Sequence, residues 1–175
     1  RTLDLFDKCD GFTRARQVQA LGMYPYFIPI TDSEGTEVEI NGRRLIMAGS
    51  NNYLGLTHRP EVIAAARDAV ERFGSSCTGS RFLNGTLELH EELERRLARF
   101  LGREAALCFS TGFQTNPGGI SALCGRDDVI FCDRENHASI FDGCRLSFAE
   151  LRKYRHEDMG DLERQLEASQ EDNVR

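Results

Sequence analysis

The stretch VIFCDRENHAS, residues 129–139, is the most informative part of this chain for its fold class. Its first four residues are apolar and predict a buried strand, and a helix is expected to begin near Ala138. His137 therefore stands at the junction between the end of a strand and the start of a helix. Ligands bind at such junctions in open α/β sheets, so the stretch predicts an α/β fold and a binding role for His137.

A second junction of the same kind lies upstream. The apolar run AALCF at 105–109 leads into STGFQTN at 110–116, where small and polar residues favour a helix start. The first N–H groups of a helix have no intrahelical acceptor, and an anion such as phosphate is favoured there. Together the two junctions predict an anion cradle beside the flat face of an imidazole.

From Gly102 onward the pattern alternates between strands and helices. We expect strands at 104–109, 128–133 and 149–155, and helices at 113–124, 138–147 and 159–168. This order predicts βαβ units, a parallel sheet and right-handed crossovers. The polar tail at 170–175 follows a helix with no closing strand, which leaves an exposed sheet edge and indicates a truncated domain.

The first hundred residues predict helices around a small β-ribbon. Strands at 36–40 and 43–47 flank Asn41-Gly42, the strongest short signal for a hairpin. We expect an amphipathic helix at 4–21, a helix at 60–73 that begins at Pro60 and is closed by Gly74, and a helix at 86–101 capped by Thr86. The glycine-rich and serine-rich stretch between the last two helices is expected to be an irregular loop.

Composition restricts the class of protein and its partners. The 175 residues are 40% apolar and 29% charged with a net charge of −6, which is typical of a soluble globular protein whose partners are small molecules rather than nucleic acid. There is no signal peptide and no apolar run of the roughly 20 residues that a membrane helix needs, so we expect a cytoplasmic protein. Peripheral membrane association stays open. The six cysteines form no C-x-x-C pair and the four histidines are scattered, which favours reduced thiols and no metal site.

Five blocks in order resemble the α-oxoamine synthases, which are pyridoxal-phosphate (PLP) enzymes of fold type I. The blocks are NNYLGL at 51–56, GSRFLNGT at 79–86, HxxLE at 90–94, STGF at 110–113 and NHAS at 136–139. The resemblance implies an N-terminal helix and β-hairpin arm over residues 1–56. It also implies that residues 57–175 are part of a large cofactor-binding domain, without its C-terminal portion or the small domain.

By this resemblance, the intact protein condenses an amino acid with an acyl-CoA, releases CO₂ and CoA, and forms an α-amino ketone, with pyridoxal 5'-phosphate as cofactor. Residues 79–86 and 142–144 look most like the serine palmitoyltransferase branch, which implies L-serine, palmitoyl-CoA and the first step of sphingolipid synthesis. One alternative is a glycine-using relative of the 2-amino-3-ketobutyrate CoA ligase, aminolevulinate synthase or 8-amino-7-oxononanoate synthase type. Another is a non-catalytic subunit paralogue. The family also implies a homodimer with shared active sites.

The resemblance assigns roles residue by residue. His137 is implied to stack on the pyridine ring of the cofactor and to help position the substrate carboxylate, as the catalytic residue of this chain; the alternative is a histidine that only caps its helix. The remaining implied contacts are Thr111, Gly112 and Phe113 for the cofactor phosphate, Asn52 and Tyr53 for the substrate, and Ser80 and Arg81 in a loop that reaches a partner's active site.

The chain departs from the family in one respect that concerns mechanism. Neither the Asp-x-x-His element that contacts the pyridine nitrogen nor the Ser/Thr-x-x-Lys element that bears the Schiff-base lysine is present. The only lysines, Lys8 and Lys153, stand in other contexts. We therefore expect the 175 residues to be the N-terminal part of a longer enzyme and to be inactive by themselves.

Overall fold

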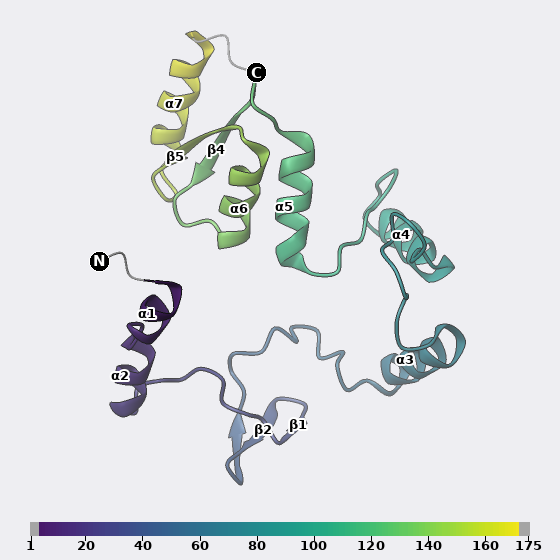
Figure 1. The fold of residues 1–175 in the computed structure, drawn as a ribbon. Coiled ribbons are helices and arrows are strands. Elements are labelled where there is room, and N and C mark those ends of the chain that lie inside the picture. Colours follow the sequence, from purple (N-terminus) through teal and green to yellow (C-terminus); the bar gives the residue numbers. More distant parts are fainter. Residues whose placement is uncertain (1–3, 172–175) are drawn as a thin grey trace. The chain divides into compact units, whose positions relative to one another are not determined.

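A computed structural model describes residues 4–171, and the chain divides into two compact units, one up to Thr78 and one from Gly79 onward (Figure 1). The expected domain division between residues 56 and 57 stays a prediction. The part of the expected polar tail at 172–175 lies outside the described residues. None of the described helices is both long and apolar enough to cross a membrane.

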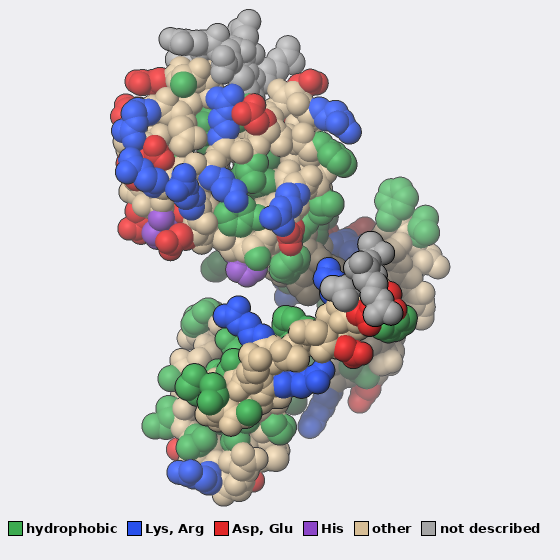
Figure 2. All heavy atoms as spheres, turned by 60° about the vertical axis from the view of Figure 1, so that its left-hand side comes forward, with side chains coloured by type: hydrophobic (Ala, Val, Ile, Leu, Met, Phe, Trp, Pro, Cys, Tyr) green, Lys and Arg blue, Asp and Glu red, His purple; other side chains and the backbone are tan. Residues whose placement is uncertain are grey.

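The first unit begins with two short helices, α1 (Leu5–Asp10) and α2 (Arg14–Ala20). The prediction of one helix over 4–21 is therefore wrong. Gly11 ends α1, with its amide bonded to the carbonyls of Asp7 and Cys9, and glycine is a poor residue for continuing a helix. Neither helix buries a residue, and Figure 2 shows hydrophobic side chains on the surface of this unit.

The predicted hairpin is confirmed as two strands of a three-stranded antiparallel sheet. Strands β2 (Glu37–Ile40) and β3 (Arg43–Ile46) pair around Asn41-Gly42, whose φ angles of 51° and 71° suit a two-residue hairpin turn. A third strand, β1 (Asp32–Glu34), pairs with β2 and was not predicted. Helix α3 (Pro60–Phe73) has the predicted bounds, and Gly74 follows it at a φ of 78°.

The second unit begins with a tight loop and helix α4 (Glu88–Phe100). Thr86 does not cap this helix, contrary to prediction. Its hydroxyl donates to the carbonyl of Arg81 at 2.7 Å, and the helix begins two residues later, where the amide of Leu87 donates to Nδ1 of His90 at 2.9 Å. The hydroxyl that was predicted to cap the helix therefore forms its hydrogen bond within the loop.

The remaining elements follow the predicted alternation except for the first strand. Helix α5 (Gly112–Leu123), strand β4 (Val129–Asp133), helix α6 (Ala138–Ser147), strand β5 (Glu150–Tyr154) and helix α7 (Met159–Glu171) agree with the expected order. The segment 104–109 is not a strand, because no described strand pairs with it. The described parallel sheet consists of β4 and β5, with Val129 opposite Glu150 and Asp133 opposite Tyr154.

The best-packed part of this unit is the contact between α5 and α6, beside β4 (Figure 1). Cys132 and Cys144 are buried at 2% and 1% exposure, and Ser139 is fully buried. Gly143 permits this close approach, because a Cβ atom there would lie 2.9 Å from the carbonyl oxygen of Asn116. The same packing holds the start of α5 and the start of α6 in one place.

Candidate functional site

The N-terminus of α5 has the form of an anion-binding site. Thr111 is the N-cap, and its Oγ1 accepts a hydrogen bond from the amide of Gln114 at 3.1 Å. The amides of Gly112 and Phe113, the first two helical residues, have no acceptor inside the helix. The surroundings of Gly112 are open, since a Cβ atom there would meet nothing within 4 Å. This terminus therefore presents free N–H groups and the positive end of the helix dipole to an approaching anion.

His137 lies just beyond the carboxyl end of β4 and caps α6. Its Nδ1 accepts a hydrogen bond from the amide of Ser139 at 3.2 Å and lies 2.6 Å from the hydroxyl of the same residue. That hydroxyl also accepts a hydrogen bond of 2.8 Å from the side-chain amide of Asn116 on α5. The capping role given above as an alternative is therefore present, but it uses only Nδ1. His137 is exposed.

The two predicted junctions meet in space. The rings of Phe113 and His137 contact each other edge to face, with centroids 6.1 Å apart and an interplanar angle of 73°. The start of α5 thus lies beside the end of β4, while the binding roles predicted for these residues stay predictions. The partners that hold this arrangement, Asn116 and Ser139, were not predicted, because their contact joins residues 23 positions apart.

An apolar groove runs from this site between α5 and α6. It has a volume of about 470 Å³ and is lined by Phe113, Gln114, Pro117, Asp142, Arg145 and Leu146. Arg145 is paired with Asp142 at 3.1 Å on the same helix, so the charged groups in the lining partly neutralise each other. The groove offers an apolar surface next to the free amides.

The loop that precedes α6 is held by a carboxylate at the end of β4. Asp133 accepts hydrogen bonds from the amides of Glu135 at 2.8 Å and Glu157 at 3.1 Å, and from Nδ1 of His156 at 3.0 Å. These bonds lower the pKa of Asp133, the amide of Glu135 first, and Asp133 in turn raises the pKa of His156. His156 is exposed, and its contact with Asp133 ties the two loops at this edge of the sheet together.

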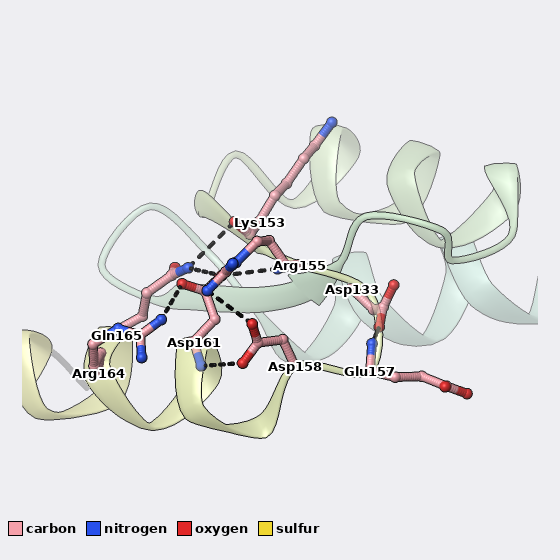
Figure 3. A network of polar contacts seen from close by, with 8 residues as sticks. All are labelled: Asp133, Lys153, Arg155, Glu157, Asp158, Asp161, Arg164 and Gln165. Carbon is pink, nitrogen blue, oxygen red and sulfur yellow. Dashed lines mark hydrogen bonds and ion pairs between the residues drawn. The ribbon is translucent and has the colours of Figure 1, made fainter.

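The start of α7 is held by a neighbouring polar network (Figure 3). Asp161 accepts a hydrogen bond from the amide of Arg155 at 2.9 Å, and its own amide donates to Asp158 at 2.8 Å. Gln165 donates to the carbonyl of Lys153 on β5 at 3.3 Å. Lys153 also lies over the ring of Phe141, with its ammonium 4.5 Å from the centroid. The lysine of this unit is thus part of the packing around β5.

The predicted substrate residues Asn52 and Tyr53 belong to the first unit, and the contacts described for them lie there. The side-chain oxygen of Asn52 accepts from the amide of Thr57 at 3.4 Å, and the hydroxyl of Tyr53 donates to Asn51 at 3.1 Å. Tyr53 is 84% exposed. The structure thus shows a polar, accessible loop within the first unit.

Ser80 and Arg81 lie in the second unit, in the loop 79–86. The guanidinium of Arg81 forms a two-point ion pair with Glu94 of α4, at 2.5 and 3.2 Å. Glu94 also accepts the amide of Cys108 at 2.8 Å, and these bonds, that of Arg81 first, lower the pKa of Glu94 to about 2. Glu94 is the last residue of the HxxLE block at 90–94, from which the sequence alone predicts no role for it. Within residues 4–171 no cluster of three or more His, Cys, Asp or Glu side chains could hold a metal ion.

Comparison with known proteins agrees with these motifs. Residues 43–175 match the family model of aminotransferase class I and II. Over 171 residues the chain is 51% identical to a serine palmitoyltransferase of Bacteroides thetaiotaomicron, covering 98% of this chain and 43% of that protein. An 8-amino-7-oxononanoate synthase of Geobacter sulfurreducens is 50% identical over 151 residues, covering 86% of this chain and 39% of the relative.

Solved structures give the same picture. A serine palmitoyltransferase of S. paucimobilis with a bound PLP-myriocin aldimine superposes with a TM-score of 0.88 at 40% identity, over 94% of this chain and 42% of that one. The serine palmitoyltransferase of Sphingomonas wittichii gives a TM-score of 0.86 at 45% identity, over 93% and 41%. The chain thus spans less than half the length of these relatives. Since the family model covers most of the chain and these folds superpose on it, the chain belongs to the aminotransferase class I and II family, in its α-oxoamine synthase branch, and has PLP fold type I.

Proposed function

We propose that the protein carrying this chain is a PLP-dependent C-acyltransferase that condenses an amino acid with an acyl-CoA and releases CO₂, CoA and an α-amino ketone. The observation that supports it is the position of His137 beside the start of α5, where the first amides are free. The ring centroids of His137 and Phe113 are 6.1 Å apart. L-serine and palmitoyl-CoA are the substrates favoured by the relatives at 51% identity. The reaction would then be the first step of sphingolipid synthesis.

The residues present fit the cofactor. The amides of Gly112 and Phe113 would bind its phosphate, and the hydroxyl of Thr111, which accepts from Gln114, still has a proton to donate. The exposed ring of His137 would lie against the flat pyridine ring, held by its bond to Ser139. When bound, PLP supplies the electron sink for the carbanion formed from the amino acid. His137 orients the substrate carboxylate, and its Nδ1 stays committed to the helix cap.

The proposal also includes the residues that contact the substrate and the oligomeric state of the protein. Asn52, Tyr53, Ser80 and Arg81 stay predicted substrate contacts. The proposed assembly is a homodimer with shared active sites in the cytoplasm. The Schiff-base lysine would come from sequence beyond these 175 residues, so the isolated chain is expected to be inactive.

A second candidate has support of its own. The 50% identity to 8-amino-7-oxononanoate synthase favours a relative that uses another amino acid and acyl-CoA. An assay of CoA release by the full-length protein with serine, alanine or glycine, each with long and short acyl-CoA, separates the two. Preference for serine with the long acyl-CoA supports the first proposal, and preference for another amino acid supports the second. No CoA release with any pair would instead support the non-catalytic paralogue.

The role of His137 is tested in the same protein with His137→Ala and with His58→Ala, an exposed histidine of the first unit, as control. We expect His137→Ala to lower both CoA release and the amount of PLP retained after dialysis, and His58→Ala to leave both unchanged. Retention of PLP and activity by His137→Ala would contradict the assignment. The intact mass of the purified protein shows whether the catalytic part is joined to this chain, because the 175 residues alone weigh 19.7 kDa.

A further inference from the structure

The ion pair between Arg81 and Glu94 joins three segments of the second unit. Arg81 lies in the loop 79–86, Glu94 on α4, and the carboxylate of Glu94 also receives the amide of Cys108 in the extended segment 105–109. One carboxylate oxygen, Oε1, accepts both from Nη1 of Arg81 at 2.5 Å and from Cys108 at 2.8 Å. A single side chain therefore connects the loop to the backbone that leads into α5.

The loop itself is closely packed and fixes the backbone of Arg81. The carbonyl of Ser80 accepts the amides of Leu83, Asn84 and Gly85, the last at 2.8 Å. A Cβ atom at Gly85 would come within 1.9 Å of the carbonyl oxygen of Gly79. The two backbone segments therefore approach so closely that only glycine fits at position 85. The hydroxyl of Thr86 then holds the carbonyl of Arg81. The backbone from which the Arg81 side chain extends is therefore restrained by these hydrogen bonds.

The side chains of this pair are largely withdrawn from solvent. The exposed fraction is 32% for the side chain of Arg81 and 15% for that of Glu94. Both terminal nitrogens of Arg81 bond to Glu94, and its Nε is buried with no partner among the described residues. Since a two-point pair uses the fork of the guanidinium, little of it is left for a substrate carboxylate.

The segment that Glu94 holds leads directly to the phosphate cradle. Phe109 follows Cys108 and packs on α5, where a Cβ atom at Gly118 would come within 2.7 Å of the Phe109 ring. Thr111 and Gly112 come two and three residues after Phe109. No described strand pairs with this segment, so the bond from Cys108 to Glu94 is a main polar restraint on its path.

We propose that Arg81 and Glu94 are positioning residues, which act through Cys108 to set the direction of the free amides at the start of α5. This role rests on the proposed function, since it needs the cradle to bind the phosphate of PLP. For Arg81, this positioning role inside its own unit would replace the direct substrate contact that the family resemblance implies. The pair adjusts the cradle without touching the cofactor.

The test uses the full-length protein and compares two ligands of the apo-form, PLP and pyridoxal, which lacks the phosphate. Glu94→Gln keeps the shape of the carboxyl and removes its charge, and Arg81→Lys keeps the charge and removes the fork. The matched control is Glu92→Gln, which removes the charge that pairs with Arg95 and Arg96 on the same helix. Binding is followed by fluorescence titration.

We expect both variants to raise the Kd of PLP by about tenfold, the loss of roughly one charge-assisted hydrogen bond. The Kd of pyridoxal and the behaviour of Glu92→Gln should stay unchanged. Equal weakening of PLP and pyridoxal would show a general structural role and overturn the inference. So would unchanged PLP affinity with a raised KM for the amino acid in Arg81→Lys alone, which would assign Arg81 to the substrate. A wild-type protein that binds no PLP would instead refute the proposed function.

Discussion

Replacement of Gly143 by alanine tests whether the contact between α5 and α6 supports the site. A Cβ atom at this position would lie 2.9 Å from the carbonyl oxygen of Asn116, and 3.0 and 3.1 Å from Cδ1 and Cβ of Ile120. The carbonyl oxygen of Asn116 and Cβ of Ile120 cannot move away by a rotation of a side chain. Overpacking of this kind costs about 1–3 kcal/mol. Because alanine gains about 1 kcal/mol over glycine inside a helix, we expect a net loss of up to about 2 kcal/mol.

Gly119 provides the control, because it lies in α5 and a Cβ atom there would meet nothing within 4 Å. Gly119→Ala keeps the gain in helix propensity without the clash, so the two variants should differ by the overpacking cost of about 1–3 kcal/mol. The free energy of unfolding is measured by urea titration followed by far-ultraviolet circular dichroism. Equal stability of the two variants would refute the argument, because it would mean that α5 and α6 do not approach as closely as described.

Three further predictions concern the cap, the histidine pair and the thiols. Thr111→Val should lower the free energy of unfolding by about 1 kcal/mol relative to Thr111→Ser, which keeps the cap hydroxyl; equal urea midpoints would argue against the cap. Because Asp133 raises the pKa of His156 above its usual 6.5, the pair stabilises the fold fully below that pH and less as the pH rises through the folded-state pKa. The difference in Tm between wild type and His156→Gln should therefore shrink at alkaline pH, and a difference that grows would contradict this sign. Cys144 is 1% exposed with a pKa raised by burial, so a thiol reagent should label it only on unfolding, whereas exposed Cys9 should react at once; equal rates would refute its burial.

The elements that depend on interactions between residues near in the sequence were predicted better than those that depend on distant partners. The hairpin at Asn41-Gly42 and the helix at 60–73 were predicted because their signals, a turn dipeptide and a proline and glycine at the ends, act within a few residues. The single helix over 4–21 failed locally, at Gly11. The prediction of a strand at 104–109 was wrong because a strand needs a neighbouring strand to pair with. The apolar composition of this segment does not show whether such a neighbour exists among the described residues.

The α/β alternation, the two junctions at Gly112 and His137 and the family could all be predicted before the structure, because they depend on residue type and spacing along the chain. The contacts around the junctions could be seen only in the folded chain: Asn116 with Ser139, Asp133 with His156, and Arg81 with Glu94. These partners are 13 to 23 residues apart. Each of these bonds joins segments that are distant in the sequence, and no local pattern specifies which polar group a distant carboxylate or hydroxyl will face.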